Sequence, residues 1–115
     1  MLIASNCDWK IKGTDIAIHA LSKLSEELEV SILRNGRDFD ATLALAKSLG
    51  LQLNVLPKVP HEDLREYYWG ADVVFDQFMS GAMGMMALEA IACGRPVVIY
   101  ISLEYCDYDD FLLKE

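Results

Sequence analysis

The 115 residues suffice for one globular domain, and their formal net charge of −8 argues against a nucleic-acid or anionic-membrane surface. Any phosphate binding must therefore come from a local pocket. No stretch approaches the roughly 20 apolar residues of a membrane span, and the first residues lack a signal-peptide layout. Cys7, Cys93 and Cys106 are odd in number and widely spaced, which favours reduced thiols in a cytoplasmic protein over a disulfide framework or a zinc site.

The chain begins with a predicted strand and helix joined by a polar loop. Residues 2–4 form a short apolar strand, and the loop after it contains Lys10 and Lys12. Thr14 is a good N-cap for the first helix. Apolar residues then recur at helical spacing, which predicts that this helix continues to about residue 27.

A second predicted strand and a second predicted helix follow. Residues 28–33 are mostly apolar and predict the strand, and a polar turn leads to a helix capped by Asp38 or Asp40. That helix ends near residue 49, where Gly50 provides a C-cap glycine.

The third strand and helix are bounded by proline and glycine. Residues 51–56 alternate apolar and polar side chains for most of their length, which is typical of a strand. Pro57 and Pro60 bracket a connection, residues 61–63 form the first turn of a helix, and Gly70 ends it.

The most informative stretch predicts a strand, a loop, a helix and another strand. Residues 73–75 are apolar and suit a buried strand, and residues 77–84 form a tight loop. Residues 85–93 are mostly good helix formers, Gly94 is the C-cap, and residues 96–100 begin the last strand. The periodicity then decays through residues 102–115.

The order β-α-β-α-β-α-β-α-β predicts one α/β domain with a parallel sheet covered by helices on both faces, because short helices between buried strands imply right-handed crossovers. We expect the strand order 3-2-1-4-5, counted along the chain. The switch point of the sheet then lies between the first and fourth strands. The loops after those two strands would face each other across one crevice.

These two loops contain residues suited to a phosphate group. One carries Lys10 and Lys12; the other contains Gly81 and Gly84 and opens the helix at residue 85. A glycine-bearing turn at a helix start presents backbone N–H groups and the positive end of the helix dipole. An isolated Gly-x-x-Gly is weakly informative, and loop lysines often serve only solubility. Their convergence nevertheless favours a phosphate-containing ligand.

Three stretches together resemble the C-terminal, nucleotide-sugar-binding domain of GT-B glycosyltransferases, in the large group that includes sucrose and mannosyl transferases (family 4, glycosyl transferases group 1). They are Lys-Gly-Thr-Asp at residues 12–15, the approach to the fourth strand at residues 68–72, and Glu-Ala-Ile-Ala-Cys-Gly-Arg-Pro-Val-Val at residues 89–98. The resemblance spans nearly the whole chain. It implies a Rossmann-like fold and retaining transfer of a sugar from a nucleoside-diphosphate donor.

The resemblance also implies roles for individual residues. Lys12 would bind the donor diphosphate, Gly84 and the amides of Met85 and Met86 would hold phosphate at the helix start, and Glu89 would accept hydrogen bonds from the ribose hydroxyls. The connection at residues 59–60 would bind the base. No metal or other cofactor is expected, because the lysine and the helix dipole can stabilise the leaving diphosphate.

The sequence departs from the pattern of this family at three points. Gly81 stands where a glutamate usually lies beside the donor sugar, and Cys7 stands where an arginine is common. Lys10 is the candidate replacement for that arginine. Residues 1–115 also match only the donor-binding domain, so we expect activity on a glycan or other acceptor to need the N-terminal acceptor domain, which this sequence lacks.

Two other classes of protein stay open. A receiver-like signalling domain has a similar size, but it needs an aspartate at the end of the third strand, where this chain has Leu56 and Pro57. A non-catalytic Rossmann-like interaction module, which has lost turnover, is supported by Gly81 in place of the glutamate. Donor hydrolysis or transfer, after the chain is joined to an N-terminal domain, would discriminate against such a module.

Overall fold

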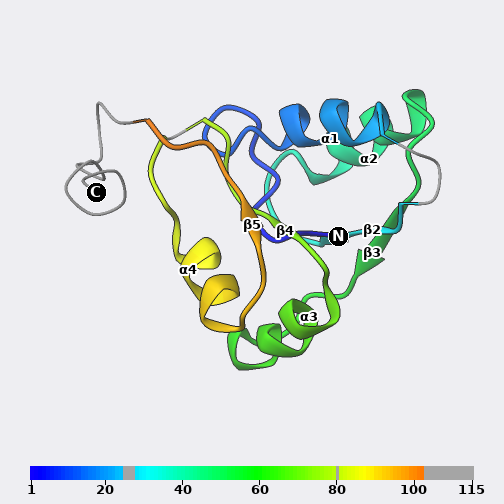
Figure 1. Ribbon diagram of the computed structural model, residues 1–115. Helices are drawn as coiled ribbons and strands as arrows, with labels where there is room; N and C mark the ends of the chain where they lie inside the picture. Colours follow the sequence, from blue (N-terminus) through cyan, green and yellow to red (C-terminus); the bar gives the residue numbers. More distant parts are fainter. Residues whose placement is uncertain (25–27, 80, 103–115) are drawn as a thin grey trace.

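The computed structural model describes residues 1–24, 28–79 and 81–102, in which strands and helices alternate (Figure 1). The strands are β1 (Leu2–Ile3), β2 (Val30–Leu33), β3 (Leu53–Leu56), β4 (Val74–Phe75) and β5 (Val97–Val98). The helices are α1 (Thr14–Ser22), α2 (Phe39–Ser48), α3 (Leu64–Gly70) and α4 (Met85–Ala92), and a 3₁₀ turn, η1 (His61–Asp63), leads into α3.

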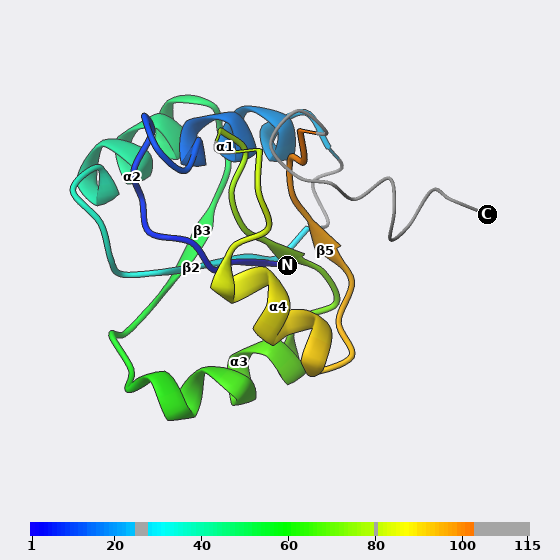
Figure 2. The same cartoon turned by 90° about the vertical axis from the view of Figure 1, so that its left-hand side faces the viewer.

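The strands form one parallel sheet in the order β3-β2-β1-β4-β5. This confirms the α/β class and the predicted strand order, and it puts the switch point between β1 and β4. Helices α1 and α2 cover one face of the sheet, and α3 and α4 cover the other (Figures 1 and 2). Within the described ranges, no helix is long and apolar enough to cross a membrane.

Each face of the sheet has its own hydrophobic core, because neighbouring residues of a strand point to opposite faces. Ile3, Ile32 and Phe75 pack with Ile18 and Leu21 beneath α1 and α2. The adjacent strand residues Leu2, Leu33 and Val74 pack with Leu64 and Tyr68 on the side of α3 and α4. Burial on both faces explains why the strands read as apolar runs in the sequence.

The boundaries of several elements differ from the predicted ones. Gly13, not Thr14, is the N-cap of α1, and the Thr14 hydroxyl donates to the carbonyl of Asn6 at 3.2 Å. The threonine therefore ties the helix to the end of β1. Helix α1 ends at Ser22, with Lys23 as its C-cap. The tail after residue 102 lies outside the described residues.

Three strands are also shorter than predicted, including the two at the switch point. β1, β4 and β5 have two residues each. Backbone hydrogen bonds extend the pairing beyond these bounds, since Ala4 N–H donates to the Phe75 carbonyl at 2.9 Å and Asp76 N–H to the Val98 carbonyl at 3.2 Å. Polar residues therefore begin directly at the carboxyl edge of the sheet.

Candidate functional site

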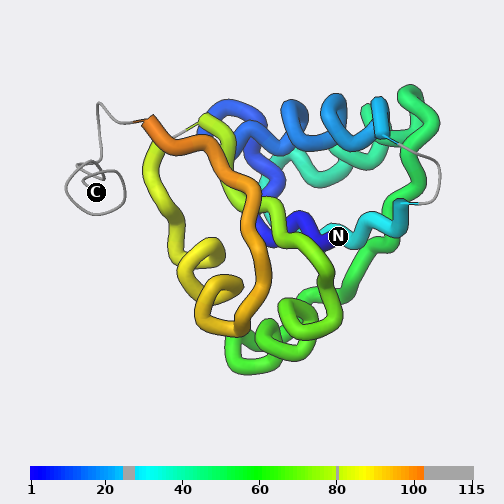
Figure 3. The backbone as a smooth tube through the Cα atoms, in the orientation of Figure 1, coloured from blue at the N-terminus to red at the C-terminus, as the bar shows by residue number. Residues whose placement is uncertain are grey.

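The loops that follow β1 and β4 lie side by side at the carboxyl edge of the sheet (Figure 3). The backbone N–H of Phe78 donates to the carbonyl of Lys12 at 2.7 Å. A Cβ atom added to Gly13 would lie 2.9 Å from Cγ of Met79, and Gly13 has a φ of 68°. Both the space and the backbone conformation therefore require a glycine here. The two loops that the strand order was expected to bring together are in direct contact.

Lys12 reaches across this contact to the end of β4. Its Nζ donates to Oε1 of Gln77 at 2.8 Å, and Nε2 of Gln77 donates to the carbonyl of Ala82. Lys10, the other predicted cation, is exposed on the β1–α1 loop. The side chain of Lys12 is thus linked through one amide to the loop that opens α4.

Asp76 occupies the amino end of α4 from the neighbouring strand. Its Oδ2 accepts a hydrogen bond from the backbone N–H of Ala87 at 3.2 Å, and the residue is 2% exposed. Burial raises the pKa of Asp76, although the Ala87 N–H and the nearby Lys12 lower it and Glu89 raises it further. The charges of Lys12 and Glu89 are therefore both felt at this one carboxyl.

The predicted phosphate loop is shaped by two glycines with different roles. Gly81 has a φ of 73°, which favours glycine for its backbone conformation. Gly84 is the N-cap of α4 with a φ of −85°, and a Cβ there would lie 2.7 Å from Oδ2 of Asp76. Gly84 is therefore required for space. Met85 and Met86 supply the first two N–H groups of α4, which no helix can pair internally.

Glu89, one turn further along α4, has a partner on each carboxylate oxygen. Nε2 of His61 lies 2.6 Å from Oε1, and the Tyr68 hydroxyl lies 3.1 Å from Oε2. The same hydroxyl is 2.9 Å from Sδ of Met86. Burial, followed by the hydrogen bond to Glu89, raises the pKa of Tyr68 well above its usual value. The phenol is therefore a neutral donor that fixes the glutamate.

A small cavity of about 80 Å³ lies beside these groups, at the carboxyl ends of β1, β2 and β3. Its lining includes Val59, from the connection predicted to bind the base, together with Met86 of α4. Arg34 and Lys58 bring two cationic side chains to the lining, and Asn6 adds an amide. The guanidinium of Arg34 also lies over the ring of Phe39 on α2, 5.0 Å from its centroid.

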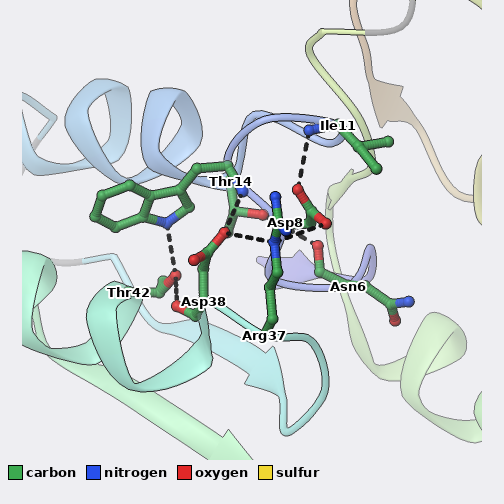
Figure 4. A network of polar contacts seen from close by, with 8 residues as sticks. Asn6, Asp8, Ile11, Thr14, Arg37, Asp38 and Thr42 are labelled. Carbon is green, nitrogen blue, oxygen red and sulfur yellow. Dashed lines mark hydrogen bonds and ion pairs between the residues drawn. The ribbon is translucent and has the colours of Figure 1, made fainter.

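The β1–α1 loop is held by a polar network with the start of α2 (Figure 4). The backbone N–H of Trp9 donates to Oδ2 of Asp38 at 2.8 Å, and its indole N–H donates to Thr42 at 3.0 Å. Nε of Arg37 lies 3.4 Å from Oδ2 of Asp8 and 3.8 Å from Oδ2 of Asp38. The carboxylate of Asp38 therefore serves this loop, and it makes no side-chain cap to its own helix.

Cys7 is a packing position at the base of this loop. Its N–H donates to the carbonyl of Asn35 and its own carbonyl accepts from Asp38, at 2.9 and 2.8 Å. The thiol is buried, and burial raises its pKa to about 11. The structure therefore uses Cys7 as a buried packing residue at the position where the family resemblance implies an arginine.

The structure thus brings Lys12, Gly84 and the start of α4 together around Asp76 and Gln77, whereas Lys10 is exposed on the same loop as Lys12. The Glu89 carboxylate lies near enough to influence the pKa of Asp76. Four residues in contact with this set had no role predicted from the sequence. They are Asp76, Gln77, His61 and Tyr68. The sequence did contain a signal for Asp76 and Gln77: both are polar, and they directly follow a buried strand at the switch point of the sheet.

Residues 1–108 match the family model of "Glycosyl transferases group 1". The D-inositol 3-phosphate glycosyltransferase of Xylanimonas cellulosilytica is 35% identical over 94 residues, which cover 76% of this chain and 22% of that protein. The lipopolysaccharide glucosyltransferase WaaG of Escherichia coli K12 is 32% identical over 114 residues, which cover 94% of this chain and 30% of that protein. The chain therefore spans less than a third of the relatives it matches, and it belongs to the group 1 glycosyltransferase family.

Proposed function

We propose that the crevice between β1 and β4 binds the diphosphate of a nucleoside-diphosphate sugar, as the donor half of a GT-B glycosyltransferase. The main support is that two adjacent residues hold Lys12 and the amino end of α4: Nζ of Lys12 donates to Gln77, and the N–H of Ala87 donates to Asp76. A cation and free helix amides are the groups that bind phosphate oxygens in proteins. The net charge of −8 repels a dianion, so its attraction to this chain has to come from such a local site.

Each group at the crevice has a role that its chemistry supports. A lysine ammonium has three N–H donors, of which Gln77 accepts one, so two can bind phosphate oxygens. The N–H groups of Met85 and Met86 lie in the first turn of α4, where the unpaired amides of a helix are suited to phosphate oxygens. The exposed Lys10 adds long-range attraction.

The nucleoside would extend from the diphosphate toward Glu89 and the small cavity. Each carboxylate oxygen has two lone pairs, so Glu89 can accept from ribose hydroxyls while His61 and Tyr68 hold it in place. The cavity beside Val59 would hold the base. Its cationic residues, Arg34 and Lys58, complement base carbonyls or the charge of the nucleotide.

In the reaction, the bond between the sugar carbon and the diphosphate oxygen breaks, a bond forms from that carbon to the acceptor oxygen, and the acceptor's hydroxyl proton passes to the leaving diphosphate. Lys12 and the α4 dipole would stabilise the charge that develops on the leaving diphosphate, so the chemistry needs no metal ion. Retention of configuration, the sugar and the acceptor are proposals from the family resemblance. The acceptor would be bound by groups other than this donor crevice.

A binding module without turnover is the second candidate, because Gly81 stands where the family resemblance implies a carboxylate. The two candidates differ in the fate of a bound donor. Release of free sugar or its transfer, measured after this chain is joined to an N-terminal domain of a relative, would favour the enzyme. Nucleotide binding without either reaction would favour the module.

The first test is calorimetric titration of the full chain with UDP and GDP. We expect one of them to bind, and Lys12→Ala and Glu89→Ala to raise its Kd by about tenfold or more, since hydrogen bonds to charged groups contribute about 1.5–3 kcal/mol. Lys47→Ala and Glu66→Ala are the matched controls, because both residues are exposed and lie away from the crevice. A folded protein that binds neither nucleotide would contradict the proposal.

A further inference from the structure

Gln77 is a buried amide at the centre of the contacts between the two loops. The residue is 4% exposed. Its Oε1 accepts from Nζ of Lys12 at 2.8 Å, its Nε2 donates to the carbonyl of Ala82, and its backbone carbonyl accepts from the N–H of Tyr100 at 3.0 Å. Three segments of the chain therefore hold it, and its side chain joins the lysine loop to the turn before α4.

The packing around Gln77 leaves little freedom for its side chain. A Cβ atom on Gly84 would lie 3.2 Å from both Cδ and Nε2 of Gln77. The amide therefore rests against the backbone of the α4 N-cap. The adjacent backbone bond, from Phe78 N–H to the Lys12 carbonyl at 2.7 Å, fixes the main chain of the lysine next to this amide.

The choice of an amide at this position has a chemical consequence for Lys12. A neutral oxygen orients the ammonium without cancelling its charge, whereas a carboxylate would form an ion pair and reduce its attraction for an anion. A flexible lysine also loses rotamer freedom when it binds a ligand, and a side chain that is already fixed loses less. Gln77 thus orients and partly orders the lysine without adding a negative charge of its own.

We propose that Gln77 is a positioning residue for the donor diphosphate, holding Nζ of Lys12 and the turn before α4 in one fixed arrangement. This inference rests on the proposed function. Gln77 does not itself touch the ligand, so its effect on affinity passes through Lys12. Its contribution must therefore disappear when Lys12 is removed.

A double-mutant cycle on the full chain tests this dependence. Gln77→Met keeps the side-chain length and removes both the acceptor oxygen and the NH2 donor of the amide. We expect it to raise the Kd for UDP or GDP about tenfold in the natural background and less than twofold in the Lys12→Ala background. Gln52→Met is the matched control, since Gln52 is exposed before β3, away from the carboxyl edge, and should leave the Kd unchanged. Should Gln77→Met fail to fold, Gln77→Asn, which is too short to span both partners, takes its place.

A second readout follows Lys12 without any ligand. A hydrogen-bonded ammonium exchanges its protons slowly, so we expect an observable ¹⁵N resonance from Lys12 Nζ in the natural chain and in Gln52→Met, and its loss in the Gln77 variant. Equal changes of Kd in the two backgrounds, or an unaltered Lys12 resonance, would overturn the inference alone. A natural chain that binds neither nucleotide would overturn it together with the proposed function.

Discussion

Asp76 acts as a helix cap supplied by a strand. The N-cap of α4 is Gly84, which has no side chain, and the third N–H of the helix instead finds Oδ2 of Asp76, eleven residues upstream of Ala87. The carboxylate gains the favourable end of the helix dipole. It is nevertheless buried, and burial, together with the charge of Glu89, raises its pKa although the helix N–H and Lys12 lower it. The ionised cap is thus held at a cost.

That cost predicts a dependence of stability on pH. In the unfolded chain Asp76 has an ordinary pKa of about 3.9. As the pH rises above this value the unfolded state releases its proton before the folded state does, so the natural protein loses stability until the raised folded pKa is passed. Asp76→Asn keeps an oxygen for Ala87 and cannot ionise.

The measurement is the free energy of unfolding in urea for both proteins from pH 3.5 to 8. We expect the stability of Asp76→Asn, relative to the natural chain, to increase with pH above the unfolded pKa of about 3.9 and to become level once the raised folded pKa of Asp76 is passed. Titrating groups that do not interact with Asp76 cancel in the difference. A difference that stays constant with pH would show that the folded pKa of Asp76 is not raised.

At the scale of elements, the β1–α1 loop depends on the turn between β2 and α2. Gly36 has a φ of 103°, and a Cβ atom there would lie 2.4 Å from the backbone nitrogen of Cys7. The backbone of the β1–α1 loop thus packs directly against the backbone of the β2–α2 turn, and only a glycine at residue 36 permits this approach. The Asp38–Trp9 hydrogen bond reinforces the same junction. The position of Lys12 follows from this junction, since Lys12 N–H donates to the Asp8 carbonyl at 2.8 Å.

Gly36→Ala should therefore be unusually damaging for a surface glycine. We expect a loss of at least about 2 kcal/mol in the free energy of unfolding, from backbone strain and the clash with Cys7. Gly50→Ala is the matched control: Gly50 also has a positive φ, 76°, but no atom lies within 4 Å of its Cβ position. It should lose about 1 kcal/mol. Equal losses in urea unfolding would rule out the close approach as the cause.

For the whole molecule, the two helical layers share a single thin sheet. Each layer contributes one of the two tryptophans: Trp9 packs against α2, and Trp69 lies on α3 with Arg65 6.0 Å from its ring. The cores on the two faces use alternate residues of the same strands. Neither core can persist when the sheet separates, so the layers should unfold together.

Single-tryptophan variants test this cooperativity. In Trp9→Phe the remaining Trp69 reports on the α3 layer. In Trp69→Phe the remaining Trp9 reports on the α2 layer. In each variant we expect the urea midpoint from fluorescence to match that from circular dichroism, although Trp9→Phe should lie lower because it loses about 1 kcal/mol with the hydrogen bond to Thr42. Midpoints that separate within one variant would indicate layers that unfold independently.

The fold could be predicted because its signals are local and repeated. Apolar runs, helical spacing and glycine C-caps gave five strands, four helices and one parallel order. The exact start of α1 could not be predicted, because the Thr14 hydroxyl binds Asn6 in preference to its own helix. Lys12 and the start of α4 stood out through motif spacing. Gln77 did not, because its partner Lys12 lies 65 residues away and only the packed sheet joins them.

The carboxylate of Asp76 also has a consequence for the proposed diphosphate site. A side chain fixed by the fold needs no translational entropy to occupy the helix start, so it acts as a resident competitor for anions there at very high effective concentration. Under the proposed function, a small free anion with one charge and no second anchor would compete poorly with this carboxylate. A diphosphate would instead bind Lys12 and the N–H groups of Met85 and Met86 together, and would leave the hydrogen bond between Asp76 and Ala87 in place. We therefore expect the proposed site to favour a multidentate ligand over abundant monovalent salts.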